Sequence, residues 1–127
     1  NTNYKFEKID IVGNKLIGRK IQNILNTQTT NGKLSVFATI NVKENNFEKD
    51  KNKSGKITSY NLEIIADVAV NSQSKSVSEQ IQKISSYDVG TYYTDTITNQ
   101  KRTRGYLISQ IVNEIKSLVE NEFGNVN

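Results

Sequence analysis

The sequence of 127 residues lacks five residue types altogether: cysteine, histidine, methionine, tryptophan and proline. Without histidine or cysteine, it contains no Ser-His or Cys-His nucleophile and none of the usual zinc ligands. No apolar run approaches the roughly 18 residues that a membrane-spanning helix needs. These absences exclude the common hydrolytic triads, the usual zinc sites and a transmembrane helix.

The length fits one domain with one core, so we expect residues 1–127 to form a single domain. Lysine and arginine outnumber aspartate and glutamate by 17 to 13. The resulting net charge of +4 favours anionic partners such as nucleic acid, anionic lipid or phosphorylated glycan. The chain begins at Asn1 and not at methionine, as expected of a mature form or fragment whose targeting segment has been removed.

Alternation of apolar and polar residues predicts the strands. It is strict over residues 34–43 and clear again over 57–70, which predicts two long antiparallel strands with one buried face each. Residues 4–12 and 76–88 show weaker forms of the pattern. The polarity of 76–88 indicates a strand at a sheet edge or against a partner. Residues 44–56 are polar and charged, so we expect them to form a solvated hairpin tip.

Apolar residues spaced three and four apart predict two amphipathic helices. The first spans residues 15–26, with Asn14 as its cap and Gly18 as a point of close approach to the sheet. The second ends near Glu122, with Gly124 placed to terminate it. The apolar stripes of the two helices consist of Leu16, Ile17, Ile21, Ile24 and Leu25, and of Leu107, Ile108, Ile111, Val112, Ile115, Leu118 and Val119.

The resulting order, β-α-β-β-β-α, predicts the α+β class: a two-layer sandwich in which two helices pack on one face of a mainly antiparallel four-stranded sheet. The other sheet face is then uncovered. Phe37 and Ile65 interrupt its polar pattern, so we expect them to be exposed cross-strand neighbours. They form either a small satellite cluster or the centre of a partner-binding patch. The rest of that face is polar and suits a polar enclosure as well as bulk water.

The carboxylates do not form a catalytic or metal-binding pattern. Glu63 and Asp67 share a strand face, but about 13 Å separates them, too far for a paired acid and base. Glu44, Glu48 and Asp50 are spaced unlike a calcium loop, and no glycine-rich phosphate loop is present. We therefore expect no enzymatic activity, no metal and no cofactor.

Lys101, Arg102 and Arg104 are the candidate binding residues. They lie where the last helix is expected to begin, and the planar fork of arginine can hold a phosphate in two places at once. A helix N-terminus adds N–H donors and a positive dipole end. Tyr92 and Tyr93, just before them, offer stacking or hydrogen bonds. The cluster predicts an anion-binding site, although three such charges also fit an ordinary solvated helix face.

A series of short motifs carries a family resemblance. The residues are Ser86-Tyr87, Tyr92-Tyr93, Arg104 to Ile108 and Ile111 to Ile115, preceded by Phe6 to Ile11, Gly18 to Leu25 and Gly55 to Thr58. In this order and spacing they resemble the LptE family, the lipopolysaccharide-assembly lipoproteins of Gram-negative outer membranes, and its alphaproteobacterial branch in particular. The chain departs from the family at Thr94 to Asn99, which is threonine-rich where the family's last helix begins in alanine- and glutamate-rich sequence.

The resemblance implies a lipoprotein on the periplasmic side of the outer membrane, held by a lipid anchor on an upstream cysteine that is absent from this chain. Such a protein plugs the lumen of the β-barrel LptD, helps that barrel fold, and contacts lipopolysaccharide on its way to the cell surface. The resemblance implies the ligand role for Lys101, Arg102 and Arg104. The expected interface residues are Tyr87, Tyr92 and Tyr93, together with Phe37 and Ile65 of the uncovered face.

The alternative is a basic α+β nucleic-acid-binding module, which the pI of about 9.2, the basic residues and the tyrosines also suit. Its charges are dispersed along the chain, and a net charge of +4 is modest for a nucleic-acid footprint. We therefore expect no nucleic acid partner. A hydrolase has no supporting residues.

Overall fold

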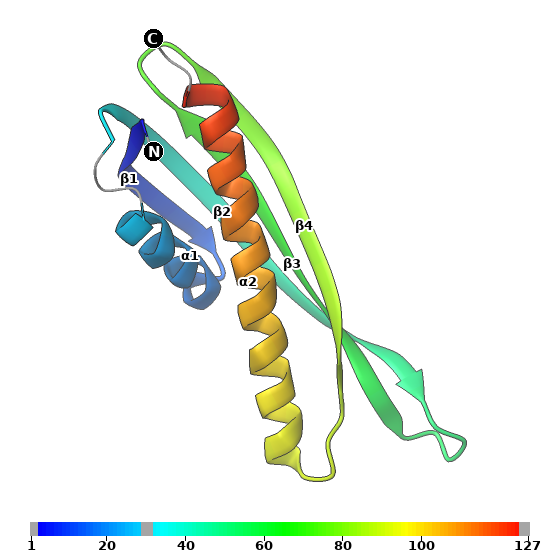
Figure 1. Cartoon of the computed structure of the whole chain (residues 1–127). Helices are drawn as coiled ribbons and strands as arrows, with labels where there is room; N and C mark the ends of the chain where they lie inside the picture. The colour runs from blue at the N-terminus through cyan, green and yellow to red at the C-terminus, as the bar shows by residue number, and fades with distance from the viewer. Residues whose placement is uncertain (1–2, 29–31, 125–127) are drawn as a thin grey trace.

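The computed structural model describes residues 3–28 and 32–124. It contains six elements in the order β-α-β-β-β-α (Figure 1). They are β1 (Tyr4–Gly13), α1 (Lys15–Gln28), β2 (Leu34–Lys51), β3 (Ile57–Asn71), β4 (Ser76–Asp88) and α2 (Tyr93–Phe123). The element order and the α+β class confirm the prediction from periodicity.

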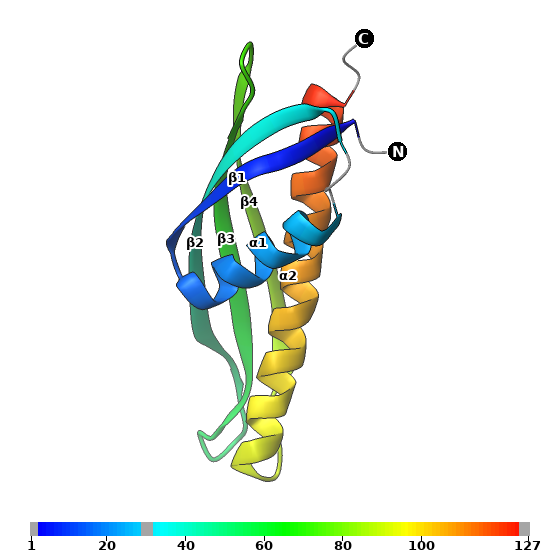
Figure 2. The same cartoon turned by 90° about the vertical axis from the view of Figure 1, so that its left-hand side faces the viewer.

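The four strands form one mixed sheet in the order β1-β2-β3-β4. β1 runs parallel to β2, and the other two pairings are antiparallel. A parallel neighbour needs a crossover connection, which α1 supplies. Both helices pack on the same face of the sheet, so the opposite face is uncovered (Figure 2). The outer strands β1 and β4 are the two edges of the sheet.

One apolar core lies between the sheet and the helices. Alternate residues of β2 and β3 enter it, as the sequence predicts, and meet one stripe of α1 and one of α2. Side chains with no exposed surface include Ile21 and Leu25 of α1, Ile40 of β2, Ile64 of β3 and Ile111 of α2. Burying each one contributes about 1.5–3 kcal/mol of hydrophobic free energy. The core is therefore the main source of stability.

A β-bulge in β1 explains the irregular pattern of its apolar residues. The register with β2 shifts between Phe6 and Lys8. Tyr4, Phe6 and Ile9 therefore all face the core, although their spacing is not strictly alternate. Val12 lies beyond the bulge and is exposed.

α1 begins and packs as its sequence indicates, with one exception. The Asn14 side chain caps the helix, because its Oδ1 accepts the backbone N–H of Ile17 at 3.0 Å. Gly18 is buried against β1, where a Cβ would collide with the side chain of Ile11. The prediction that Leu16 belongs to the buried stripe is wrong, since Leu16 is 64% exposed. With Gly18 at the contact, Leu16 lies about 200° away around the helix and faces solvent.

The hairpin between β2 and β3 is longer than the sequence pattern predicts. β2 extends to Lys51, so residues 44–51 are strand and not part of the connector, although residues 45–51 are exposed, as expected of a solvated tip. Backbone pairing with β3 continues through two bulges near Asp50, because ladder hydrogen bonds do not depend on side-chain polarity. The turn is confined to residues 52–56, where the Asn52 side-chain oxygen accepts two backbone N–H groups.

α2 begins earlier than the sequence indicates. Its first residue is Tyr93, so the threonine-rich segment 94–99 is helical despite its low helix propensity. Asp95 stabilises this start, because its carboxylate accepts the backbone N–H of Tyr92 at 3.2 Å. The expected start close to Lys101 is wrong by about two turns.

The molecule is elongated, and its two ends differ (Figure 1). At the core end, α1, β1 and the last turns of α2 enclose the apolar core, and Asn3 Nδ2 donates a hydrogen bond to the Gly124 carbonyl at 2.7 Å. The distal end consists of the β2–β3 hairpin beyond residue 43, the β4–α2 loop (89–92) and the first half of α2 (93–106). In the part of the chain that the structure describes, neither helix has the length and apolar content to cross a membrane.

Candidate functional site

The three predicted ligand residues do not form one free cluster in the structure. Arg104 faces β2, where its Nε and Nη2 donate to the two carboxylate oxygens of Glu44 at 2.5 and 3.2 Å. Only 16% of the Arg104 side chain and 19% of the Glu44 side chain are exposed. Lys101 and Arg102 are exposed on α2. Arg104 therefore serves an internal ion pair, while Lys101 and Arg102 remain available to an anion.

The expectation that a helix N-terminus reinforces these charges is wrong. Lys101 lies about two turns inside α2, which begins at Tyr93. The N-terminal turn already holds the Asp95 carboxylate, and an acidic side chain there offsets the positive end of the helix dipole. An anion at Lys101 and Arg102 would be held by these side chains and not by the helix end.

A group of polar contacts joins the distal hairpin to β4 and α2. The Tyr87 hydroxyl donates to Asn46 Oδ1 at 2.7 Å and accepts a hydrogen bond from Gln100 Nε2 at 3.2 Å. Its ring stacks on Tyr60, with 5.6 Å between the ring centroids. Burial raises the pKa of the Tyr87 phenol above its usual value. We call the following residues the polar layer: Glu44, Asn46, Tyr87, Gln100 and Arg104.

The tyrosines predicted at the interface fall into two groups. Tyr87 is only 6% exposed, so its side chain contacts the molecule itself and is not available to a partner. Tyr92 and Tyr93 are 71% and 78% exposed. They follow a loop that is fixed to α2, since the Gly90 N–H donates to Thr96 Oγ1 at 2.9 Å. The structure therefore presents two of the three tyrosines on an ordered distal surface.

Phe37 and Ile65 lie on the uncovered sheet face, but they are not neighbours. Phe37 is 41% exposed, as expected, and Ile65 is partly covered. Phe37 pairs with Asn71, and Ile65 pairs with Lys43. Positions 37 and 43 are six residues apart on β2, so roughly 20 Å separates the two apolar side chains along the strand. The predicted cross-strand cluster is wrong, because strand register and not face alone decides which side chains meet.

Polar side chains on the uncovered face satisfy one another. The Glu63 carboxylate accepts hydrogen bonds from the amide groups of Asn45, at 2.9 Å, and of Gln82. Asp67 accepts one from Gln80 at 2.9 Å. The hydrogen bonds from Asn45 and Gln82 hold the pKa of the Glu63 carboxyl below its usual value. Glu63 and Asp67 are therefore already hydrogen-bonded to amides.

A shallow groove between α1 and α2 includes one of the predicted ligand residues. Its volume is about 340 Å³, and its lining contains Lys20 and Ile24 of α1 with Lys101 and Ile108 of α2. The groove combines two ammonium groups with apolar surface, which is the chemistry that an anionic amphiphile requires. The sequence does not point to Lys20, because the pairing of two helices far apart in the chain leaves no local pattern.

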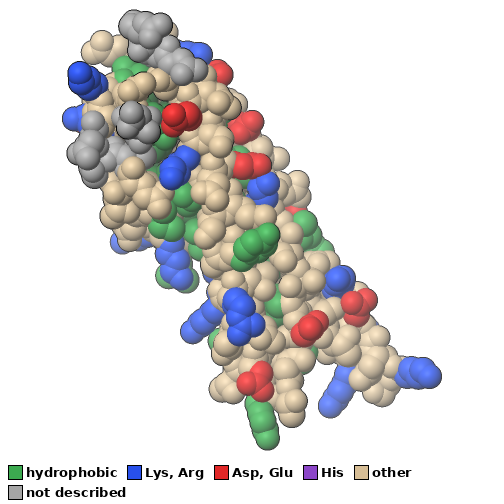
Figure 3. Space-filling model, viewed as in Figure 1, with side chains coloured by type: hydrophobic (Ala, Val, Ile, Leu, Met, Phe, Trp, Pro, Cys, Tyr) green, Lys and Arg blue, Asp and Glu red, His purple; other side chains and the backbone are tan. Residues whose placement is uncertain are grey.

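The face shown in Figure 3 does not carry a continuous basic patch. Lys and Arg side chains are scattered singly over the face shown in Figure 3, with acidic side chains among them. A nucleic-acid footprint is typically a continuous basic patch or stripe. Within residues 3–28 and 32–124, no three acidic side chains come together to hold a metal ion.

Comparison with known proteins relates this architecture to a group of bacterial proteins. No protein-family model matches the sequence. No curated protein matches it either. The structure is similar to that of rare lipoprotein B from Shewanella oneidensis, with a TM-score of 0.69 and 11% sequence identity over 93% of this chain and 98% of that chain. The chain has the fold of a bacterial lipoprotein.

Two further solved structures share this lipoprotein fold. A protein from Caulobacter crescentus described as a lipoprotein gives a TM-score of 0.63 at 10% identity, over 95% of this chain and 92% of that chain. An uncharacterized lipoprotein B from Nitrosomonas europaea gives 0.56 at 13% identity, over 96% and 93% of the two chains. At these identities the similarity establishes the fold, and it does so over nearly the whole of each chain.

Proposed function

We propose that this chain is the folded domain of an outer-membrane lipoprotein of the LptE type, which plugs an LptD-like β-barrel and contacts lipopolysaccharide. The observation that carries the proposal is the end-to-end similarity of its fold to three solved lipoprotein structures. The LptE-like motifs support the same family from the sequence. A role in lipopolysaccharide transport then follows from the family and is the part to be tested.

The uncovered sheet face suits enclosure inside a barrel. Its carboxylates Glu63 and Asp67 already accept hydrogen bonds from amide groups. Moving a hydrogen-bonded carboxylate out of bulk water costs less free energy than moving one that has no hydrogen bond. The lumen of an outer-membrane barrel is polar, so it can complement the remaining amides and hydroxyls of this face. Phe37 adds an exposed apolar contact.

The arrangement of the chain ends fits a tethered plug. Asn3 lies at the core end, beside Gly124. A lipid anchor on a cysteine upstream of Asn1 would therefore hold the core end at the inner leaflet of the outer membrane. The distal end, with the exposed Tyr92 and Tyr93, lies at the opposite extremity of the molecule (Figure 1). We propose that these tyrosines contact the barrel.

Fewer of the residues predicted from the sequence are proposed to contact lipopolysaccharide. Lys101 and Arg102 are exposed and can make charge-assisted hydrogen bonds to phosphate or sugar-acid groups. Lys20 joins Lys101 in the groove between α1 and α2. Arg104 has a structural role instead, because its guanidinium is already paired with Glu44.

Co-purification from the native membrane tests the barrel partnership. Full-length lipoprotein extracted in mild detergent should carry a large outer-membrane β-barrel with it. The double variant Tyr92→Ala/Tyr93→Ala should reduce the recovered barrel, since it removes two exposed aromatic side chains from the distal end. Tyr106→Ala is the matched control, because Tyr106 is also exposed but lies farther along α2. Recovery of the lipoprotein without any barrel contradicts the proposed function.

A pull-down with purified lipopolysaccharide tests the ligand site. The variant Lys101→Glu/Arg102→Glu should bind at least about tenfold more weakly, because two charge-assisted contacts become repulsive. Lys53→Glu/Lys56→Glu, in the exposed turn, makes the same change in net charge elsewhere and should bind normally. Equal loss in both variants indicates attraction by net charge alone, and unchanged binding in the first rules out the site. Tighter binding to an oligonucleotide than to lipopolysaccharide would favour the nucleic-acid alternative.

A further inference from the structure

The two edges of the sheet differ in how well they are protected from pairing with another strand. β1 has a bulge, and its charged residues are Lys5, Glu7, Lys8 and Asp10. Bulges and charged side chains are the features that keep an edge strand from adding a further strand. The β1 edge is therefore protected.

The β4 edge is less protected, because it has no bulge and a smaller share of charged side chains than β1. β4 pairs with β3 over its 13 residues without a register shift, so it is a regular strand. Before its final residue, Asp88, its only charged side chains are Glu79 and Lys83. Because β4 is the last strand of the sheet, the backbone N–H and C=O groups on its outer side have no strand to pair with. A 13-residue edge of this kind is a template for one more strand.

We propose that β4 pairs in antiparallel fashion with β4 of a second copy of this chain, about a two-fold axis at Ile81. Ile81 lies midway between Glu79 and Lys83. This register therefore places Glu79 of each copy opposite the partner's Lys83, and it does so twice. Moving the axis by one residue in either direction breaks both ion pairs. The inference concerns the chain on its own and does not rest on the proposed function.

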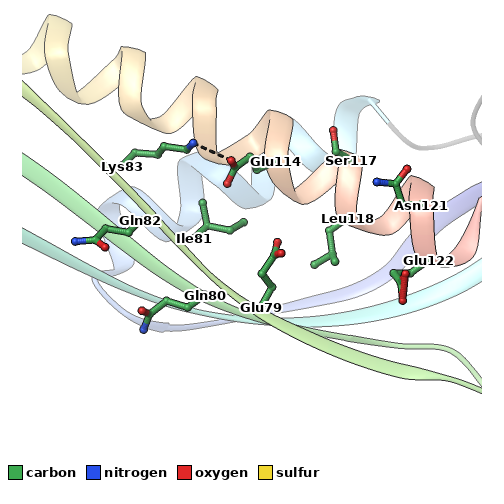
Figure 4. A pocket seen from close by; sticks show the side chains of 10 residues that line it. All are labelled: Glu79, Gln80, Ile81, Gln82, Lys83, Glu114, Ser117, Leu118, Asn121 and Glu122. Atoms are coloured by element: carbon green, nitrogen blue, oxygen red, sulfur yellow. Dashed lines mark hydrogen bonds and ion pairs between the residues drawn. The ribbon is translucent and has the colours of Figure 1, made fainter.

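Side-chain directions agree with this register. Glu79, Ile81 and Lys83 point toward α2, whereas Gln80 and Gln82 point to the other side of the strand (Figure 4). Residues directly opposite on neighbouring antiparallel strands share a face, with Cβ atoms about 4.5–5.5 Å apart. On the helix side, the two ion pairs would flank Ile81, whose own side chain is only 2% exposed because it packs into the core. On the uncovered side, Gln80 would lie opposite the partner's Gln82, and two amides can hydrogen-bond to each other.

A hollow beside this edge has the charge that the partner would complement. It is lined by β4 and α2, has a volume of about 630 Å³, and contains Glu79, Lys83, Glu114 and Glu122. Lys83 pairs with Glu114 at 2.8 Å and Lys75 pairs with Glu122 at 3.4 Å. Among the described residues, Glu79 makes no ion pair and no side-chain hydrogen bond. The partner's Lys83 supplies the missing cation, and its three N–H donors can serve two carboxylates at once.

The first test is the oligomeric state of the purified 127-residue chain, measured by sedimentation velocity over a concentration series. The expected result is a concentration-dependent dimer whose β4 backbone amides exchange hydrogen more slowly than in the monomer. A chain that stays monomeric at its highest soluble concentration overturns the proposal. The measurement uses no barrel and no lipopolysaccharide, so its outcome is separate from that of the proposed function.

Charge exchange then tests the register. Glu79→Lys alone and Lys83→Glu alone each turn two attractive pairs into two repulsive ones, and should raise the dimer Kd by about tenfold or more. In an equimolar mixture of the two variants, every pair is again of opposite charge. The mixture should therefore form a heterodimer with nearly the affinity of the unmodified chain. Circular dichroism of each variant checks that it is folded.

The control is Asp10→Lys on the opposite edge, where the side chain is also exposed. It makes the same charge change as Glu79→Lys and should leave the dimer intact. A dimer that survives both single reversals, or that Asp10→Lys weakens equally, is formed by another surface and overturns the proposal. Failure of the mixed variants to associate overturns the register at Ile81.

Discussion

The core end and the distal end of this domain are held together by different interactions. At the core end, apolar side chains of α1, α2 and the sheet are buried against one another. At the distal end, the polar layer joins the hairpin to β4 and α2 through the Arg104–Glu44 ion pair and the hydrogen bonds of Tyr87. β2, β3, β4 and α2 thus make non-directional contacts at the core end and directional ones at the distal end, whereas α1 contributes only to the core end.

This difference decides what each end tolerates. Apolar contacts are roughly proportional to buried area, so a core can accept several arrangements of similar volume. A polar contact depends on one partner, and removal of that partner leaves the other group buried without compensation. We therefore expect the core end to set the stability of the whole domain. The distal end should set the position of the hairpin relative to α2.

The largest effect is expected from a cavity at the core end. Ile111→Ala removes part of a side chain that has no exposed surface and packs between α2 and the sheet. The free energy of unfolding should fall by about 3 kcal/mol, from lost transfer energy and from the cavity. Urea denaturation measures this change. Leu16→Ala, at an exposed position of α1, is the control and should change stability by less than about 0.5 kcal/mol; a similar loss in both variants argues against the core described here.

A smaller effect is expected from breaking the ion pair of the distal end. Arg104→Ala leaves the Glu44 carboxylate mostly buried and unpaired, which should cost about 2 kcal/mol. Hydrogen exchange should speed up in residues 44–51 and not at the core end, because the hairpin opens locally. Arg102→Ala removes an exposed guanidinium and serves as control.

The double variant Glu44→Leu/Arg104→Met separates the cost of an unpaired charge from the cost of lost packing. Replacing both partners by apolar side chains leaves no unpaired charge, so most of the lost stability should return. If the double variant is as unstable as Arg104→Ala, the cost lies in lost packing at the hairpin. Protection from hydrogen exchange across residues 44–51 distinguishes the two explanations.

Loss of one hydroxyl group at the distal end should have a still smaller effect. Tyr87→Phe keeps the ring stacked on Tyr60 but removes the hydrogen bonds to Asn46 and Gln100. We expect a loss of about 1 kcal/mol in the free energy of unfolding. Tyr93→Phe removes an exposed hydroxyl from the same end and should have no measurable effect. Equal stability of the two variants would mean that the polar layer adds nothing at Tyr87.

The smallest effect on stability is expected from Glu63, on the uncovered face of the same hairpin, and it depends on pH. Hydrogen bonds from Asn45 and Gln82 lower the pKa of Glu63 below its ordinary value of 4.5. Because this pKa is lower in the folded protein than in the unfolded chain, the contribution of Glu63 is present above about pH 4.5 and is lost as the pH falls through the folded-state pKa. The stability difference between the unmodified protein and Glu63→Gln should therefore shrink as the pH falls below about 4.5. A difference that is constant over this range contradicts the assignment.

The parts of the fold that local periodicity controls were predictable from the sequence. The bounds of β4 at Ser76 and Asp88, the buried face of β3 and the end of α2 before Gly124 agree with the structure. The errors occur where tertiary contacts override local preference. Residues 44–51 are polar but pair with β3, and the threonine-rich start of α2 is helical because side chains such as Asp95 hold it. Neither effect leaves a local signal.

The candidate site was less predictable than the fold. Exposure of Lys101, Arg102 and Tyr93 follows from their position off the apolar stripe of α2. The pairing of Arg104 with Glu44 joins residues that are 60 positions apart, and charge alone does not reveal it. Register likewise separates Phe37 from Ile65, although the two share a sheet face. Sequence patterns indicate which face a side chain occupies, whereas its partner depends on the three-dimensional register.

The contact between Asn3 and Gly124 makes the folded chain almost a closed ring. The turn at residues 52–56 lies at the opposite extremity, is exposed and holds no core residue. The chain can therefore be cut there and its original ends joined by a short linker, a rearrangement that compact domains with adjacent ends commonly accept. Such a circular permutant would move the chain ends from the core end to the distal end without altering a single surface side chain. A lipid tether attached to the new chain ends would hold the domain in the opposite orientation. Comparing its partners with those of the original chain would show whether orientation or surface chemistry determines which partner the domain meets.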